Sequence, residues 1–251
     1  MTTDLNDLTD RNAVVTGAAS GIGLAVTEAF VAAGMRVLMT DLDESGLTSH
    51  TDRLADGGAE VRALVVDVTD PDAVERAAGA AIEHFGKLHV AVNNAGIVVQ
   101  GNSWELPLSE WHRIIDVDLW GVIHGIHAFV PRILASGEPG YVVNTASMAA
   151  VTAIPGIGPY TASKHGVLGI SDGLRAELAA IGAPVGVSVV MPGMIKTGLN
   201  PFGTVGAEQV AANVVDAMRR GRPYVFTDDH HIPEVESRLR AIIAARADVV
   251  S

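Results

Sequence analysis

The sequence has no cysteine, few aromatic residues and few charged ones, and each shortage narrows what the protein can do. Without cysteine there are no disulfides, no thiolate metal ligands and no cysteine nucleophile, and a cytoplasmic location is the expectation. Hydrophobic residues make up 48% of the 251 residues and charged residues 18%. This balance excludes intrinsic disorder and leaves ample material for a core.

Basic residues are also scarce. The 17 Lys and Arg residues are outnumbered by 29 Asp and Glu residues, giving a net charge of -12. Such an acidic field repels phosphate backbones, so we expect no nucleic-acid partner. The start, MTTDLNDLTD, lacks the basic and apolar regions of a signal peptide, and the uncharged stretches 139–163 and 178–195 are broken by proline and glycine. We therefore expect no membrane partner.

Short β-branched runs alternate with longer Ala-rich stretches of helical period up to about residue 227. The strands are predicted at residues 13–16, 36–40, 61–66, 89–92, 141–144, 185–191 and 224–226, and the helices at 22–33, 43–55, 71–85, 109–134, 160–180 and 207–220. This alternation predicts a Rossmann-like, doubly wound α/β fold: a three-layer αβα sandwich with a mainly parallel seven-stranded sheet. Ligands of such a fold bind beyond the carboxyl ends of the strands.

We expect residues 1–251 to form a single dinucleotide-binding catalytic domain, with residues from about 228 to 251 as a C-terminal helical extension. A charged helix predicted at 233–247 carries four apolar residues on one side: Val235, Leu239, Ile242 and Ile243. This side can pack on the same domain or on a partner subunit, and the sequence leaves both open.

A glycine-rich segment, TGAASGIG, follows the first predicted strand and opens a helix. Gly17, Gly21 and Gly23 let the backbone turn tightly and approach a pyrophosphate, whose charge is met by N–H groups at the helix N-terminus. The spacing departs from GxGxxG, so an ordinary glycine-rich turn is an equal alternative.

Carboxylate and amide side chains end the next strands. Asp41 can accept hydrogen bonds from both hydroxyls of an adenosine ribose and repel a phosphate there; with no Arg or Lys nearby, this favours NAD over NADP. A turn or N-cap residue is the alternative. Asp67 has the same choice between adenine contact and turn, and Asn94, Ala95 and Gly96 form a small polar corner at the same edge.

The segment YTASK places Tyr160 and Lys164 four residues apart, on one face of a predicted helix. A free phenol has a pKa of about 10, and an adjacent ammonium stabilises the phenolate, which makes Tyr160 a candidate general acid/base. Ser147 ends the preceding strand and can hydrogen-bond a substrate oxygen. The alternative is an exposed Tyr–Lys helix pair with no catalytic role.

Taken in order, TGAASGIG, Asp41, NNAG, Ser147, YTASK and MPGMIKT resemble the short-chain dehydrogenase/reductase family over roughly residues 12–226. The resemblance implies an oxidoreductase that moves hydride between NAD and a secondary alcohol or ketone. In it Ser147 orients the substrate oxygen, Tyr160 transfers the proton, and Lys164 holds the nicotinamide ribose and lowers the pKa of the tyrosine. The implied cofactor-binding residues are Gly17, Ser20, Gly21, Ile22, Gly23, Asp41, Leu42, Asp67, Val68, Asn94, Ala95, Gly96, Tyr160, Lys164, Pro192, Gly193, Ile195 and Thr197.

The sequence departs from the family pattern in two places, at one residue and in the C-terminal segment. Asp118, in IDVDLWG, stands where the family usually has an asparagine that kinks the helix and supports a water leading to the lysine, and we include it among the catalytic residues. If the backbone does this work, Asp118 substitutes with little loss; if the side chain matters, its carboxylate attracts Lys164 and alters the pH optimum. The tail YVFTDDHHIPEVESRLRAII replaces the family's glycine-rich interface segment. The helices at 109–134 and 160–180 match its dimer interface, so we expect a homodimer or homotetramer.

The expected substrate is a small, uncharged, mainly hydrophobic alcohol or ketone. The loop 197–207 is short, with Leu199, Pro201 and Phe202, and no Arg or Lys is placed to clamp an anion. The apolar residues expected around the site are Ile97, Val98, Met148, Ile154, Met194 and Phe202. No metal site is predicted. The alternatives are an NADP-dependent carbonyl reductase and a non-catalytic dinucleotide-binding regulator or scaffold.

Overall fold

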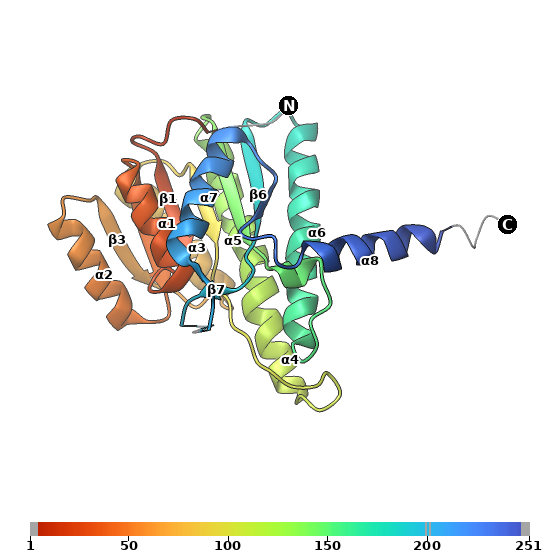
Figure 1. Ribbon diagram of the computed structural model, residues 1–251. Helices are drawn as coiled ribbons and strands as arrows, with labels where there is room; N and C mark the ends of the chain where they lie inside the picture. Colours follow the sequence, from red (N-terminus) through yellow and green to blue (C-terminus); the bar gives the residue numbers. More distant parts are fainter. Residues whose placement is uncertain (1–4, 199, 201, 247–251) are drawn as a thin grey trace.

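The computed structural model describes residues 5–198, 200 and 202–246, and a parallel sheet between two layers of helices forms its body (Figure 1). Along the sheet the strands are β3 (Val61–Val65), β2 (Arg36–Asp41), β1 (Asn12–Thr16), β4 (Val90–Asn93), β5 (Gly140–Thr145), β6 (Val185–Met191) and β9 (Tyr224–Phe226), all paired in parallel. The chain order reverses between β1 and β4. Ligands bind at this reversal, beyond the carboxyl ends of the strands.

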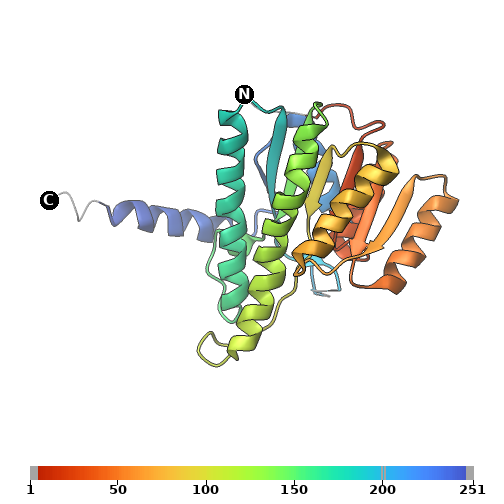
Figure 2. The same cartoon turned by 180° about the vertical axis from the view of Figure 1, so that it is seen from behind.

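Helices cover both faces of the sheet. One layer contains α1 (Gly21–Ala32), α2 (Glu44–Asp56) and α7 (Ala207–Arg220); the other, nearer the viewer in Figure 2, contains α3 (Pro71–Phe85), α4 (Leu108–Ile115), α5 (Gly121–Ala135) and α6 (Gly158–Ala180). In β1, Ala13 and Val15 pack with the first layer and Val14 with the second. Burial on both faces explains the continuous apolar runs of the strands. The predicted Rossmann-like fold is confirmed.

The long helix predicted at 109–134 is not one α-helix. Between α4 and α5 the chain forms a π-helical turn, η1 (Asp116–Trp120), which widens the helix by one residue. The turn carries Asp118, whose side chain is fully buried. The helix predicted at 109–134 is present as the continuous helical run Leu108–Ala135, and the π-helical turn within it falls where the sequence departs from the family pattern.

A second small sheet was also missed. Strands β7 (Ile195–Lys196) and β8 (Val205–Gly206) pair in parallel; β7 directly precedes the loop predicted at 197–207, and β8 lies within it. Strands of two residues have no readable periodicity, which is why the sequence did not indicate them. Of the residues predicted in this loop, Leu199 and Pro201 lie outside the described residues.

One helical run among the described residues, Leu108–Ala135, is long and apolar enough by composition to cross a membrane. It packs here against α3 and α6 on one face of the sheet. Its hydropathy is that of a core helix in this fold.

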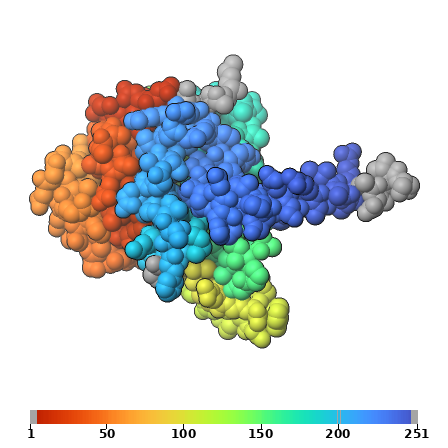
Figure 3. Space-filling view, viewed as in Figure 1, coloured from red at the N-terminus to blue at the C-terminus, as the bar shows by residue number. Residues whose placement is uncertain are grey.

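The C-terminal helix α8 (Ile232–Ala244) projects from the body (Figures 1 and 3). Near its start Val235 is buried beside Val167 and Met191, and Arg238 donates a hydrogen bond to Nε2 of His165 on α6 at 2.7 Å. Further along, three apolar residues are exposed: Leu239, Ile242 and Ile243. Only the first part of the predicted apolar side therefore packs on its own domain.

Candidate active site

A cavity of about 940 Å³ lies at the carboxyl ends of the central strands and holds most of the predicted site residues. Those that line it are Gly17, Ser20, Gly21, Ile22, Asp41, Leu42, Asp67, Val68, Asn94, Ala95, Gly96, Ser147, Tyr160, Lys164, Pro192, Gly193, Ile195 and Thr197. Gly23 and Asp118 do not line it, because both are buried in the structure around it. The fold thus brings segments from the whole chain to one cavity.

The glycine-rich turn forms one end of this cavity. Gly17 and Gly21 have φ values of +65° and +53°, which favour glycine, and a Cβ on Gly23 would collide with the carbonyl oxygen of Gly17. Helix α1 begins at Gly21, and the side chain of its N-cap residue, Ser20, makes no capping hydrogen bond. The first-turn N–H groups are therefore available to an anion such as a pyrophosphate.

Asp41 forms the wall beside that turn. Its Oδ2 accepts a hydrogen bond from the N–H of Ala19 at 2.9 Å, and its Oδ1 accepts one from the N–H of Asp43 at 3.1 Å. Among the described lining residues Lys164 is the one Lys or Arg, and it lies beside Tyr160. A phosphate at this wall would face a fixed carboxylate with no cation to offset it.

Asp67 lines the cavity and also stabilises a turn. Its Oδ1 accepts hydrogen bonds from the N–H and the hydroxyl of Thr69, at 2.8 and 2.7 Å. The turn role is therefore present, and contact with adenine stays a prediction for this lining residue. The carboxylate fixes the backbone that leads from β3 into α3.

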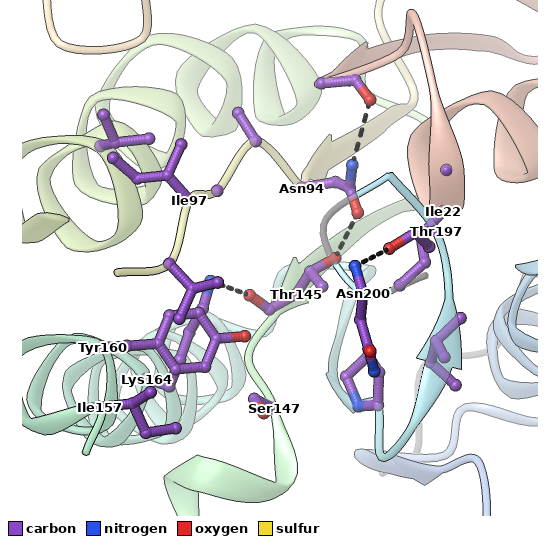
Figure 4. A pocket seen from close by; sticks show the side chains of 18 of the residues that line it. Ile22, Asn94, Ile97, Thr145, Ser147, Ile157, Tyr160, Lys164, Thr197 and Asn200 are labelled. Atoms are coloured by element: carbon purple, nitrogen blue, oxygen red, sulfur yellow. Dashed lines mark hydrogen bonds between the residues drawn. The ribbon is translucent and has the colours of Figure 1, made fainter. Parts of the chain in front are cut away.

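Asn94 holds three strand ends together (Figure 4). Its Nδ2 donates to the carbonyl oxygens of Thr16 and Gly17, at 3.1 and 3.3 Å, and its Oδ1 accepts from the hydroxyl of Thr145 at 3.2 Å. The side-chain amide thus links the ends of β1, β4 and β5. Asn94 thereby fixes the position of the sheet edge that borders the cavity.

Tyr160 and Lys164 lie in the first turns of α6, where Pro159 helps to start the helix. Their spacing puts them on one face, with Lys164 Nζ 5.3 Å from the centre of the Tyr160 ring. Lys164 is buried, and the hydroxyl of Tyr160 points into the cavity on the side of Ser147 (Figure 4). The alternative of an exposed helix pair is excluded by this burial.

Ser147 directly precedes a short 3₁₀ turn, η2 (Met148–Ala150). Its Oγ accepts a hydrogen bond from the N–H of Ala149 at 3.1 Å, which fixes the oxygen at the edge of the cavity. A hydroxyl that accepts in this way still has its own hydrogen to donate. Ser147 can therefore donate a hydrogen bond to a substrate oxygen.

Asp118 and Lys164 form a buried ion pair, with Oδ2 and Nζ 3.1 Å apart. The other carboxylate oxygen accepts from the N–H of Ile97 at 2.8 Å, and Nζ also donates to the carbonyl oxygen of Thr145 at 3.2 Å. Burial raises the pKa of Asp118, with Lys164 opposing it. Burial opposes the charge of Lys164, yet Asp118 and Tyr160 raise its pKa above the ordinary value.

The far part of the cavity has both apolar and polar walls. Four of the six predicted apolar residues line it: Ile97, Val98, Ile154 and Met194. The other two do not, since Met148 is turned into the core and Phe202 points to solvent, 86% exposed. The prediction for these two was wrong because the loops around them bend in ways that the sequence does not indicate.

Further lining residues in three loops were not predicted from the sequence, Gln100, Gly101, Asn102, Glu105, Pro155, Gly156, Ile157, Gly198 and Asn200 among them. The N–H of Gly101 donates to the carbonyl oxygen of Gly156 at 2.9 Å, in a parallel bridge between Gly101 and Ile157. This bridge ties the loop after β4 to the loop after η2. Such long-range pairing leaves no local sequence signal.

Comparison with known proteins gives the same family as the sequence motifs. The chain matches the family model for short chain dehydrogenases over residues 11–203. It is 43% identical to the 1-deoxy-11-beta-hydroxypentalenate dehydrogenase of Streptomyces avermitilis, over 88% of this chain and 86% of that protein. It is 35% identical to the cyclohexanol dehydrogenase of an Acinetobacter species, over 84% and 88%.

Solved structures are also similar. A short chain dehydrogenase/reductase from Burkholderia phymatum, crystallised in complex with NAD, superposes with a TM-score of 0.94 at 31% identity and covers 96% of this chain and 97% of its own. The apo form of LigD from Sphingobium superposes with a TM-score of 0.87 at 29% identity, over 95% and 98%.

Proposed function

This chain belongs to the short-chain dehydrogenase/reductase family, whose members bind a nicotinamide dinucleotide, and from that premise we propose that it is an NAD(H)-dependent dehydrogenase interconverting a secondary alcohol and a ketone. One observation carries the proposal. Ser147, Tyr160 and the buried Lys164 meet in the same cavity as a glycine-rich turn suited to a pyrophosphate. Cofactor and substrate can thus bind side by side.

The residues divide the proton transfer among them. In oxidation the hydroxyl of Ser147 donates a hydrogen bond to the substrate oxygen, and the phenolate of Tyr160 takes the hydroxyl proton. In reduction the phenol of Tyr160 returns a proton to the ketone oxygen. The ammonium of Lys164, 5.3 Å from the ring centre, stabilises the phenolate. When bound, the nicotinamide ring supplies or accepts the hydride.

The preference for NAD is proposed from Asp41. The carboxylate is fixed by the N–H groups of Ala19 and Asp43 and suits two ribose hydroxyls as acceptor. The extra phosphate of NADP would face this charge. The residues proposed to hold the cofactor are the eighteen predicted ones, with Gly23 acting through the shape of the turn.

The proposed substrate is neutral and mainly hydrophobic. Ile97, Val98, Ile154 and Met194 supply apolar walls, Glu105 at the rim is acidic, and the ammonium of Lys164 is already paired with Asp118. A carboxylate substrate would therefore bind without a free cation in the described part of the cavity. This chemistry resembles the neutral ring alcohol named for the Acinetobacter relative more than the acid named for the Streptomyces relative.

We also propose a single catalytic domain that assembles with further copies of itself as a dimer or tetramer. The seven-stranded sheet with its two helical layers supports one domain over the described residues. The exposed apolar residues of α8, Leu239, Ile242 and Ile243, support a partner subunit as the place where the outer part of this helix packs.

The test is turnover. The protein is mixed with a panel of neutral secondary alcohols and NAD or NADP, and reduced nicotinamide is followed by absorbance, with Tyr160→Phe in parallel. We expect turnover with NAD on cyclic alcohols, and its loss in the variant. If no alcohol or ketone reacts while NADH binding is intact, the proposal is wrong and a dinucleotide-binding regulator or scaffold takes its place.

A further inference from the structure

Asp118 stands where the family usually has an asparagine, and it forms an ion pair with Lys164. Asp118 is brought inward by the π-helical turn η1, has no exposed surface, and contacts the lysine directly at 3.1 Å. An asparagine at this position would offer the same shape without the charge. The difference between the two residues is therefore electrostatic.

One hydrogen bond, to Oδ1, and one ion-pair contact, at Oδ2, favour the carboxylate form of Asp118. Its Oδ1 faces the N–H donor of Ile97 at 2.8 Å, and its Oδ2 faces the ammonium of Lys164 at 3.1 Å. A protonated carboxyl needs an acceptor for its own hydrogen, and both oxygens face donors instead. Asp118 and Lys164 thus form a pair with opposite charges and little net charge.

Other charged groups around the pair are few among the described residues. Arg113 on α4 acts on Asp118 from a distance, and Tyr160 acts on Lys164 from the same helix. Asp116 belongs to the same π-helical turn but is exposed. His165, next to Lys164, makes its hydrogen bonds with Thr161 and Arg238. Asp118 is therefore the carboxylate that offsets the charge of Lys164.

Granting the proposed function, we propose that Asp118 is a positioning residue that neutralises Lys164, so that proton transfer through Tyr160 requires a more alkaline solution than with an amide at the same position. A lone ammonium stabilises the phenolate of Tyr160 fully. An ammonium paired with a carboxylate stabilises it less, because the carboxylate repels the phenolate. Removal of the alcohol proton is then harder than beside an unpaired ammonium, so alcohol oxidation accelerates as the pH rises.

The decisive variant is Asp118→Asn, which retains an oxygen for the N–H of Ile97 and removes the charge. Its matched control is Asp116→Asn, the same change on the same turn at an exposed position. We expect the acid limb of kcat/KM for alcohol oxidation to move to lower pH by about one pH unit or more in Asp118→Asn. The control should keep the wild-type profile, and NADH should bind both variants.

An acid limb at the same pH in wild type and Asp118→Asn, with both folded and binding NADH, would overturn the inference. If Asp118→Asn fails to fold, Asp118→Ser is used, since it also removes the charge and is smaller. The same shift is then expected, and an unchanged limb contradicts the inference equally. A purely structural role for Asp118 would lower stability without moving the limb.

A second measurement separates this inference from the proposed function. Tyrosinate absorbance is titrated in wild type and in Asp118→Asn, and the Tyr160→Phe version of each is subtracted to isolate Tyr160. The midpoint should be lower in Asp118→Asn. Coincident midpoints would overturn the inference. If no substrate turns over but the midpoints differ, the proposed function is wrong while the electrostatic role of Asp118 holds.

Discussion

The two ends of the sheet each hold a carboxylate in an ion pair, but one carboxylate is buried with a single cation and the other is partly exposed among three basic side chains. At the carboxyl ends, Asp118 pairs with Lys164 where both are buried. At the amino ends, Glu138 contacts Arg11 at 2.6 Å, His89 at 3.2 Å and Lys87, and its side chain is 37% exposed.

Burial raises the pKa of Asp118, whereas hydrogen bonding to Lys87 lowers the pKa of Glu138 to about 2. The two carboxyl groups are therefore shifted in opposite directions, because burial dominates at Asp118 and the basic partners dominate at Glu138. The ion pairs of Glu138 at the amino end can stabilise the fold with only a small desolvation penalty. Charges at the carboxyl end are retained despite that cost, which is typical of a functional site.

The largest expected effect is at the carboxyl end. Tyr160→Phe removes the proposed acid/base, and turnover should fall by roughly 10²-fold or more while NADH still binds. Steady-state kinetics and NADH fluorescence measure the two quantities. Tyr224→Phe, which removes the hydroxyl that donates to Asp172 outside the cavity, is the control and should retain activity. Equal activity in both variants would contradict the assignment.

The next effect is on stability. Lys164→Met leaves the buried carboxylate of Asp118 without its cation and should lower the free energy of unfolding by about 3–5 kcal/mol. Urea denaturation measures this loss. The double variant Lys164→Met with Asp118→Asn should recover part of it, and Lys87→Met at the amino end should lose much less. A loss in Lys87→Met as large as in Lys164→Met would break the comparison.

A smaller effect is expected at the wall of the cofactor turn. Asp41→Ala removes the carboxylate that would face the extra phosphate of NADP, so the NAD-over-NADP ratio of kcat/KM should fall on the order of tenfold. Asp43→Ala is the control, because that side chain caps α2 and does not line the cavity. An unchanged ratio in Asp41→Ala would mean that selectivity arises elsewhere.

The smallest effect is at the amino end and depends on pH. The pKa of Glu138 in the folded state is about 2, below the value of about 4.3 for an unperturbed glutamate. Its stabilisation is therefore present above that unfolded value and is lost as the pH falls towards the folded one. Glu138→Gln should be less stable than wild type at neutral pH, and the gap should narrow below about pH 4.3. Urea denaturation across this range tests it, and a gap that widens on acidification would have the wrong sign.

Much of the fold could be predicted from the sequence because both helical layers bury regular apolar patterns. The predicted bounds of α3, α7, β6 and β9 agree with the structure, and other elements differ at their ends. The π-helical turn could not be predicted. Its extra residue is accommodated by contacts of Asp118 with Ile97 and Lys164, which come from distant segments.

The candidate site likewise has residues that the sequence predicts and residues that it does not. Gly17, Asp41, Asn94 and Tyr160 follow directly from strand ends and helix spacing, because parallel strands bring their carboxyl ends to one edge. Gln100 and Glu105 belong to the loop after β4, which backbone pairing joins to the loop after η2, and no residue type indicates that pairing. The cavity-lining residues at strand ends and on α6 are thus better predicted than those in the loops.

The bridge between Gly101 and Ile157 affects how the substrate specificity of such a protein can change, in evolution or by mutagenesis. The two loops that form this wall of the cavity are joined through main-chain groups, from the N–H of Gly101 to the carbonyl of Gly156. Side chains such as Ile97 and Ile154 project from these loops without joining them. Single substitutions there can therefore redraw the shape of the pocket while the loops stay in place, which makes this wall the natural target for a saturation library.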